Sequence, residues 1–186
     1  LIFHALFTYS IFLKFIGGLS PITFFRKIKN VALFAFSTSS SAATIPVTLK
    51  TVNQDLGVNQ NVASFVVPVG ATINMDGTAI MQGLATVFIA QMSGIDLTLF
   101  QYGQVVLLAV ATSIGTAAVP SAGTITLIII LQQFNLPLEA IGIILAVDRV
   151  LDMIRTSVNV TGDAAIACIV AKSENQLDET IFNSHK

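Results

Sequence analysis

Residues 70–78, with the sequence GATINMDGT, interrupt a long apolar segment over residues 60–94. Asp76 is the single charged residue between positions 56 and 95, and the glycine that follows it permits unusual backbone conformations. A helix that breaks here leaves carbonyl oxygens without intrahelical partners. Carbonyl, Asp and Asn oxygens are hard ligands that suit Na⁺ or another hard cation. The stretch therefore predicts a broken helix that carries a cation site, with a kinked helix and a buried, hydrogen-bonded Asp as the alternative.

The composition around this stretch is that of an integral membrane protein. The 186 residues are 54% hydrophobic and 10% charged, with a mean hydropathy of +0.82, whereas soluble domains carry about 25% charged residues. The 42 residues between Asp96 and Glu139 carry no charge. A membrane span needs roughly 20 apolar residues, so this length suits two passes.

The same composition argues against other classes of protein. The net charge is −1 and no basic run is present, so we expect no nucleic-acid partner. One cysteine, Cys168, excludes an internal disulfide framework. The two histidines, His4 and His185, lie at opposite ends of the sequence, which argues against a histidine metal site. Because the chain opens in an apolar run without an initiator Met, we expect it to be a fragment whose N-terminal part is missing.

Two further apolar segments are interrupted by small and hydroxyl residues. One carries STSSSAATIP at residues 37–46, and the other carries SIGTAAVPSAG at residues 113–123. Irregular backbone is tolerated at membrane depth only where it is buried in protein or lines a cavity. Each stretch therefore predicts the tip of a hairpin that enters the membrane and returns, and helix N-termini at such tips suit a carboxylate.

These signals predict an all-α integral membrane fold with broken transmembrane helices and two re-entrant helical hairpins. The basic residues Arg26, Lys27 and Lys29 place the first connection on the cytoplasmic side, and Tyr9 and Tyr102 are assigned to the membrane interface. The predicted segments are the end of a transmembrane helix at 1–19, a first re-entrant hairpin at 21–57 with its tip at 37–46, a broken transmembrane helix at 60–94, a second re-entrant hairpin at 97–134 with its tip at 113–123, a last transmembrane helix at 137–171 and a cytoplasmic tail at 172–186.

The order of these segments contains a weak internal repeat. In each half, a hairpin is followed by a helix that carries Asn and Asp near a Gly, at residues 74–77 and 159–163. The two hairpins would enter the membrane from opposite sides. Inverted repeats with broken helices are a recurring transporter plan, in which the site lies at the repeat interface. The sequence thus predicts an inverted-repeat transport domain.

The predicted last helix carries a polar face. At about 100° per residue, its ionisable and amide groups fall within an arc of about 80°, with Thr156 at its edge. These groups are Asp148, Asp152, Arg155, Asn159 and Asp163. A charge inside a bilayer costs at least about 2.5–3.5 kcal/mol, so this face must meet protein, a ligand or ions. The Arg155 guanidinium suits a carboxylate bidentately, and Asp152 suits an ammonium group. An internal salt bridge between Asp152 and Arg155 is the alternative, although three acids share the face with one base.

Taken in order, these motifs resemble the C-terminal half of the dicarboxylate/amino acid:cation symporters, the glutamate transporter family. The carrying segments are Ser39–Ser41 before Thr44-Ile45-Pro46, residues 70–78, Ser113–Thr116 with Val119–Gly123, and residues 148–163. The resemblance implies a homotrimer whose protomers move a transport domain against a fixed scaffold, as an elevator. It also implies a transporter and not an enzyme, multi-pass in the lipid bilayer of a cell (inner) membrane.

The resemblance implies roles for individual residues in an acidic amino acid site. Backbone at the first tip would hold the α-carboxylate, Thr78 and Arg155 the side-chain carboxylate, and Asp152 the amino group, while the second tip closes the pocket. The implied substrate residues are Ser40, Ser41, Thr78, Val119, Asp152, Arg155, Thr156 and Asn159.

Co-transported Na⁺ is implied in the same way, and no other cofactor is expected. The first implied sodium site uses carbonyls of Gly70, Asn74 and Asn159 with the Asp163 carboxylate. The second uses carbonyls near Thr72, Ser113, Ile114 and Thr116 and forms when the second hairpin closes. The third uses Asn74 and Asp76 with ligands from outside this chain.

Departures from the family pattern affect the gate and the coupling ion. Ala118 and Ser121 stand where relatives often have Gly, which would stiffen the second hairpin. Gln82 stands where proton-coupled relatives carry Glu, so no proton coupling is expected through it.

The predicted function is sodium-coupled symport of aspartate or glutamate by alternating access. One alternative is a proton-coupled C4-dicarboxylate symporter, against which Asp152 counts because a dicarboxylate has no amine. An ion channel with an acidic pore face and a structural subunit with buried salt bridges are alternatives from other classes.

Overall fold

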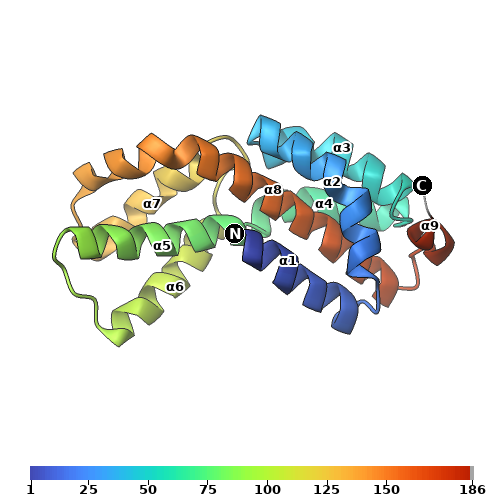
Figure 1. The fold of residues 1–186 in the computed structure, drawn as a ribbon, viewed down its shortest axis with the longest axis horizontal. Coiled ribbons are helices and arrows are strands. Elements are labelled where there is room, and N and C mark those ends of the chain that lie inside the picture. The colour runs from blue at the N-terminus through green and yellow to red at the C-terminus, as the bar shows by residue number, and fades with distance from the viewer. Residues whose placement is uncertain (185–186) are drawn as a thin grey trace.

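The computed structural model describes residues 1–184, and within that range the chain is helical apart from loops and an isolated antiparallel bridge between Val58 and Leu177 (Figure 1). The all-α prediction is therefore confirmed. The elements are α1 (Ile2–Ile11) continued by the π-helix η1 (Phe12–Ile16), α2 (Pro21–Thr38), α3 (Ser41–Gln54), α4 (Gln60–Ile73), α5 (Asp76–Met92), α6 (Leu99–Ile114), α7 (Ala122–Gln133), the 3-10 helix η2 (Leu138–Ala140), α8 (Ile141–Ser173) and α9 (Glu179–Asn183).

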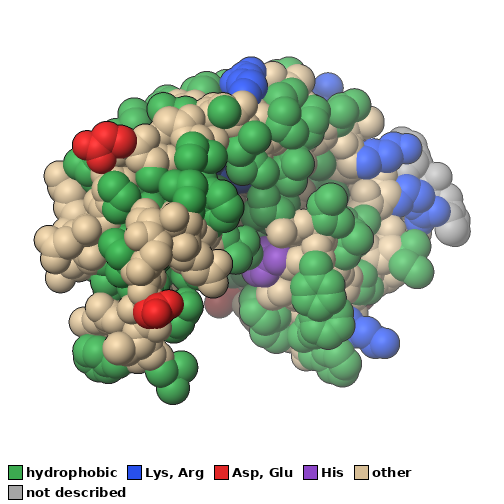
Figure 2. Space-filling model, turned by 60° about the vertical axis from the view of Figure 1, so that its left-hand side comes forward, with side chains coloured by type: hydrophobic (Ala, Val, Ile, Leu, Met, Phe, Trp, Pro, Cys, Tyr) green, Lys and Arg blue, Asp and Glu red, His purple; other side chains and the backbone are tan. Residues whose placement is uncertain are grey.

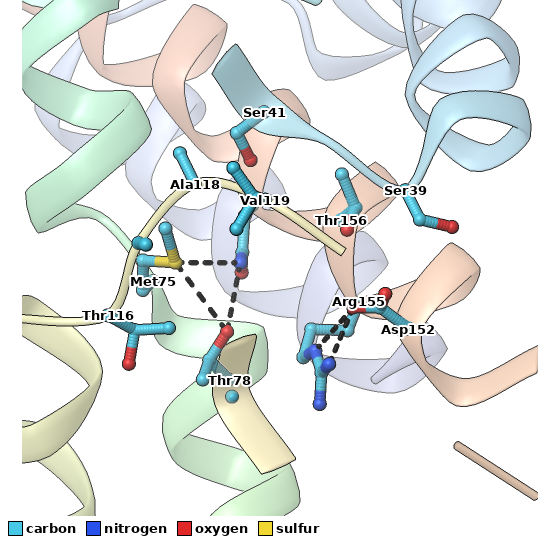
Figure 3. A pocket seen from close by; sticks show the side chains of 13 residues that line it. Ser39, Ser41, Met75, Thr78, Thr116, Ala118, Val119, Asp152, Arg155 and Thr156 are labelled. Atoms are coloured by element: carbon cyan, nitrogen blue, oxygen red, sulfur yellow. Dashed lines mark hydrogen bonds and ion pairs between the residues drawn. The ribbon is translucent and has the colours of Figure 1, made fainter. Parts of the chain in front are cut away.

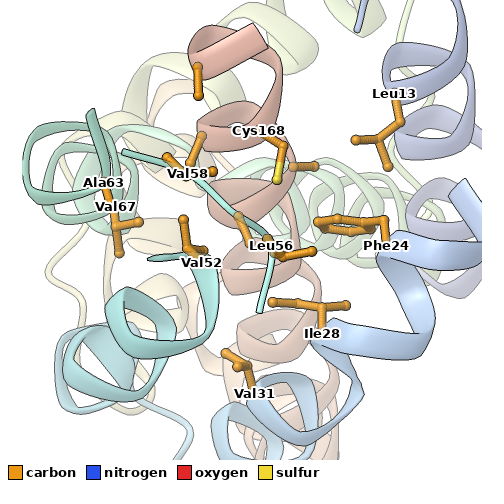
Figure 4. Close-up of a cluster of buried hydrophobic side chains, with 14 of the residues drawn as sticks. Leu13, Phe24, Ile28, Val31, Val52, Leu56, Val58, Ala63, Val67 and Cys168 are labelled. Carbon is orange, nitrogen blue, oxygen red and sulfur yellow. The ribbon is translucent and has the colours of Figure 1, made fainter. Parts of the chain in front are cut away.

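The long helix α8 joins two groups of helices (Figure 1). Its N-terminal half packs with α5 and α7, which in turn contact α6, and its C-terminal half packs with α1 to α4. Each group has its own apolar core. The larger core surrounds the C-terminal half of α8 near Cys168 (Figure 4) and includes Leu13, Phe24, Ile28, Val52 and Leu56. The smaller core includes Met81, Ile89, Leu127, Leu131 and Ile144.

Local backbone chemistry explains where the hairpin helices stop. Ser39 ends α2 in a left-handed conformation with φ of 51°, and the Ser40 hydroxyl accepts a hydrogen bond from the Ala43 N–H at the start of α3. Serine is a favoured residue at this capping position because its oxygen satisfies a free N–H. In the second hairpin, Ser121 has φ of 59° just before α7.

Both breaks are shorter than the ranges predicted for the tips. The first consists of Ser39 and Ser40, because the Ser40 cap starts α3 at once and Pro46 lies inside that helix. Pro46 has no N–H to donate within α3, yet the helix continues through it, and the small residues from Ser41 onward are helical. The second break spans residues 115–121. The re-entrant membrane placement of both hairpins stays a prediction.

The predicted tail packs against the rest of the fold through α9. Phe182 is fully buried in the larger core, and the Asp178 N–H donates to the Gly57 carbonyl at 2.8 Å. The Lys27 ammonium donates to the carbonyls of Asp55 and Ile181 at 2.8 and 2.6 Å. The Phe182 side chain and these hydrogen bonds thus anchor the segment. The polar composition of the segment did not indicate these contacts. Residues 185–186 of the predicted tail lie outside the described residues.

The surface carries many large apolar side chains. Phe3, Phe15, Leu99, Phe100 and Leu107 are each more than two-thirds exposed. Figure 2 shows apolar side chains over much of one face, with acidic groups toward one end and most basic groups toward the other. Apolar surface of this extent marks a contact with a membrane or another protein surface. Across residues 1–184, no helix is both long and apolar enough to cross a membrane.

Candidate functional site

Three helix breaks and the middle of α8 meet at one small pocket (Figure 3). Both hairpin breaks, the α4–α5 break and the middle of α8 contribute to its walls. Its volume is about 10 Å³, which is about the room that one water molecule needs. The lining residues are Ser39, Ser41, Met75, Thr78, Thr116, Ala117, Ala118, Val119, Gly123, Asp152, Arg155, Thr156 and Asn159.

Most of the predicted substrate residues lie in this lining. Ser41, Thr78, Val119, Asp152, Arg155, Thr156 and Asn159 are among them. Ser40 is outside the lining and donates its hydroxyl to the Ala118 carbonyl of the second tip at 2.9 Å. The geometry brings these residues together from four separate segments, and their contacts with a substrate stay predictions.

The buried charges of α8 form the ion pair that was weighed as the alternative. Arg155 Nη2 lies 2.5 Å from Asp152 Oδ1 and 3.7 Å from Asp148 Oδ1, and all three side chains are buried. The pair leaves part of the guanidinium unused. Within residues 1–184, the buried side-chain polar atoms without a hydrogen-bond partner are Arg155 Nη1 and Ser39 Oγ, and both residues line the pocket.

The second tip closes the pocket through hydrogen bonds to its opposite walls. The Ser121 N–H donates to Asp152 Oδ2 at 2.9 Å. The Ala118 carbonyl accepts from the Ser40 hydroxyl at 2.9 Å and from the Ala42 N–H at 3.2 Å. A ligand as large as an amino acid therefore needs these contacts to open.

Asn159 ties α8 to the start of α5. Its Nδ2 donates to Thr78 Oγ1 at 3.3 Å, and its Oδ1 accepts from the Gly77 N–H at 2.8 Å. Met75 Sδ lies 3.7 Å from the same amide nitrogen. The side-chain oxygen and nitrogen of Asn159 are thus both engaged by the α4–α5 break.

The residues of the first predicted sodium site are close together. Asn74 Nδ2 donates to Asp163 Oδ1 at 3.0 Å and to the Asn159 carbonyl at 3.4 Å. Gly70 lies against the same carboxylate, since a Cβ there would meet Asp163 Oδ1 at 2.5 Å. The donor set is a carboxylate with nearby carbonyls, which fits a hard cation.

The second predicted sodium set is only partly assembled. Ser113 and Thr116 are buried and are joined by a backbone hydrogen bond of 3.1 Å, whereas Ile114 is exposed. Thr72 is exposed, and its hydroxyl donates to the Val69 carbonyl of its own helix at 3.0 Å. In the described part of the chain, no group of three or more His, Cys, Asp or Glu side chains is placed to hold a metal ion.

The Asp76 carboxylate of the third predicted set has partners that the sequence reasoning missed. Tyr9 was assigned to the membrane interface, but this assignment is wrong because Tyr9 is buried and donates to Asp76 Oδ2 at 2.6 Å. His4 Nε2 lies 2.5 Å from the same oxygen. Thr124, also missed, donates to Asp148 Oδ1 at 2.6 Å. These contacts join residues 24 to 72 positions apart, so no local pattern indicates them.

A buried charged face between helix breaks is the architecture of a membrane transport protein. The sequence profile of the sodium:dicarboxylate symporter family matches residues 1–173, and the chain belongs to this family. This family and the relatives below are transporters and not enzymes.

Individual relatives agree with this assignment. The chain is similar to excitatory amino acid transporter 5 of Homo sapiens, with 44% identity over 92% of this chain. It is 46% identical to excitatory amino acid transporter 2 of Homo sapiens over 90% of this chain, and 47% identical to an excitatory amino acid transporter of Caenorhabditis elegans over 81%. The matched region spans about 30% of the length of these relatives.

Proposed function

We propose that the protein containing this chain is a sodium-coupled symporter of acidic amino acids, aspartate or glutamate. The observation that carries the proposal is the buried Arg155 Nη1, which has no hydrogen-bond partner within residues 1–184 and belongs to a residue that lines the pocket. A buried donor without an acceptor costs about 1–3 kcal/mol, and more when it is charged. A carboxylate in the pocket would supply the acceptor.

The neighbouring residues suit the rest of an acidic amino acid. Asp152 Oδ2 is engaged by the Ser121 N–H of the second tip, and tip opening would release it for an ammonium group. Thr78 Oγ1 lies on the wall opposite the Arg155–Asp152 pair (Figure 3). The proposed substrate residues are those implied by the resemblance, with Ser40 and Ser41 at the α-carboxylate and Thr156, Asn159 and Val119 completing the pocket.

Transport is proposed to follow alternating access. The second hairpin opens, substrate and sodium enter, the hairpin closes, and the domain crosses the membrane as an elevator in a homotrimer. Coupling requires that closure is favourable only with both ligands present, because a ligand shifts an equilibrium only by its differential affinity for the two states. The multi-pass placement in a cell (inner) membrane belongs to this proposal.

Sodium is proposed to bind at the three predicted sites. Support is strongest for the first, because Asn74 and Gly70 converge on Asp163. The second would need movement of the second hairpin to bring Thr72 toward Ser113–Thr116. The third needs ligands from the remainder of the protein.

The second candidate is proton-coupled symport of a C4-dicarboxylate, the substrate class in the family description. Such a substrate would place a carboxylate near Asp152 without an amine to neutralise it. Gln82 is buried and uses its amide to bind Gly123 and Thr126, so it offers no acid for proton coupling. The amino acid substrate is therefore preferred.

The test is uptake of labelled aspartate, glutamate and succinate by the full-length protein in proteoliposomes, under sodium or proton gradients separately. Arg155→Lys keeps the charge but removes the planar fork, and it should raise the half-saturating aspartate concentration at least about tenfold, which corresponds to ~1.4 kcal/mol. Arg149→Ala is the matched control because Arg149 is exposed on the same helix. Aspartate uptake that ignores the sodium gradient, or equal losses in both variants, would disprove the proposal.

A further inference from the structure

Asp76 has its two carboxylate oxygens in different surroundings. Oδ2 receives the Tyr9 hydroxyl at 2.6 Å and His4 Nε2 at 2.5 Å. Oδ1 receives only the N–H of Gly77 among residues 1–184, at 2.9 Å. A carboxylate has about two acceptor sites per oxygen. Oδ2 is therefore fully used, and Oδ1 retains a free acceptor direction.

Tyr9 is itself fixed from the side of α8. Its hydroxyl lies 3.1 Å from the Val158 carbonyl, and its side chain is 3% exposed. The close approach depends on Gly162, because a Cβ at this position would meet the Tyr9 oxygen at 2.5 Å. One hydroxyl thus connects α1, the backbone of α8 and the start of α5.

The same glycine also admits Asn74. A Cβ at Gly162 would meet Asn74 Nδ2 at 2.6 Å, and this amide contacts Asp163 at 3.0 Å. The two carboxylates proposed to bind sodium, Asp76 and Asp163, are therefore held by a phenol and an amide that share one opening in α8.

We infer that Tyr9 is a positioning residue for cation binding at Asp76. Its hydroxyl holds Oδ2 and thereby directs Oδ1 toward the cation, so that less rotational freedom is lost when the ion binds. The inference rests on the proposed function because the proposed function assigns sodium to Asp76. The inference adds Tyr9, which is not one of the predicted sodium ligands. Tyr9 itself would not contact the ion.

The test is sodium titration of the purified full-length protein, with the melting temperature as the readout and no substrate present. Tyr9→Phe keeps the ring and removes the hydroxyl, and we expect the sodium concentration that gives half of the thermal shift to rise about tenfold, the size expected for one lost hydrogen bond to a charged group. Tyr102→Phe is the matched control, since Tyr102 is an exposed tyrosine on α6. Uptake of aspartate by Tyr9→Phe should approach the unmodified maximal rate at high sodium.

The outcomes separate this inference from the proposed function. A sodium shift weakened by Tyr9→Phe but not by Tyr102→Phe supports the inference, even if aspartate is not transported. An unchanged sodium dependence in folded Tyr9→Phe, a lower maximal rate as its sole effect, or no sodium shift in the unmodified protein overturns it. If Tyr9→Phe does not fold, Gly162→Ala replaces it, with Gly142→Ala as the control in open space on the same helix. An unaltered sodium dependence in Gly162→Ala would also overturn the inference.

Discussion

Each acidic or amide group on the polar face of α8 has a partner from another element. The partners are Thr124 for Asp148, the Ser121 N–H for Asp152, Thr78 and the Gly77 N–H for Asn159, and Asn74 for Asp163. A hydrogen bond to a buried charged group contributes about 1.5–3 kcal/mol, so the partners of the three Asp residues stabilise the carboxylates that they contact. Arg155 differs because part of its guanidinium stays available inside the pocket.

Gly123 sets the position of that guanidinium. A Cβ at this residue would meet Thr78 Cγ2 at 2.8 Å and Arg155 Nη1 at 3.2 Å. Gly123→Ala should therefore displace Arg155, and overpacking of this kind costs about 1–3 kcal/mol. We expect aspartate affinity to fall roughly tenfold or more, measured by isothermal titration calorimetry. Gly103→Ala, where the added methyl group meets open space, should bind as the unmodified protein does, and equal binding by the two variants would contradict the prediction.

At the level of elements, the first hairpin is anchored at its base. Lys27 of α2 donates to carbonyls at the ends of α3 and α9, and Phe182 of α9 enters the core beneath α2. The second hairpin packs against α5 and α8 instead, and Gln82 of α5 donates to its Thr126 and accepts from its Thr112. The base of the first hairpin is thus anchored by a further segment of the chain, which supports the proposal that the second hairpin is the one that opens.

Asp178 should make the anchoring segment sensitive to acid. Hydrogen bonds from the Thr180 hydroxyl and the Ile181 N–H lower the pKa of the Asp178 carboxyl. Because the folded state favours the ionised form, the stabilisation is complete above the ordinary Asp pKa of about 3.9 and is lost as the pH falls through the lowered value. The amides of residues 178–183 should therefore lose protection from hydrogen exchange in this acidic range. This loss should be larger than any loss of protection in α8 over the same pH range.

The variant Asp178→Asn is the comparison for this measurement. It should show weaker protection at neutral pH and no further loss that tracks the carboxyl titration. A pH dependence identical to that of the unmodified protein would assign the effect to other groups.

At the level of the whole molecule, α8 carries the site across the junction of the two helix groups. The N-terminal group supplies the first tip and the other group supplies the second, and they meet over the pocket at the Ala118 carbonyl. Opening the pocket therefore separates parts of the two groups without unfolding either core.

Ser40→Ala should favour this opening. A neutral hydrogen bond contributes about 0.5–1.5 kcal/mol, so the open population should increase roughly two- to tenfold. Hydrogen exchange of the amides of residues 116–121 should become faster in proportion. Ser37→Ala is the control because the Ser37 hydroxyl donates only within its own helix, to the Phe34 carbonyl. Equal exchange rates in the two variants would show that the Ser40 contact does not hold the tip.

The sequence by itself determined the helical class, the location of the helix breaks and the polar face of α8. Glycine, proline, serine and helical periodicity act over a few residues, so they can be read directly from the chain. The family assignment followed from the same motifs. Most of the substrate residues that the resemblance to the family implied line the pocket, and their contacts with a substrate stay predictions.

Only the tertiary structure decided which distant groups meet. The Tyr9–Asp76 contact, the Thr124–Asp148 contact and the burial of Phe182 depend on how α1, α7 and α9 pack against other elements. Such contacts join residues that are far apart in the sequence. The sequence pattern of one segment does not show which residue of a distant segment will pack against it. The GATINMDGT stretch at residues 70–78 illustrates this division. Its own residues predict the helix break, whereas the contact between Tyr9 and Asp76 follows only from the fold.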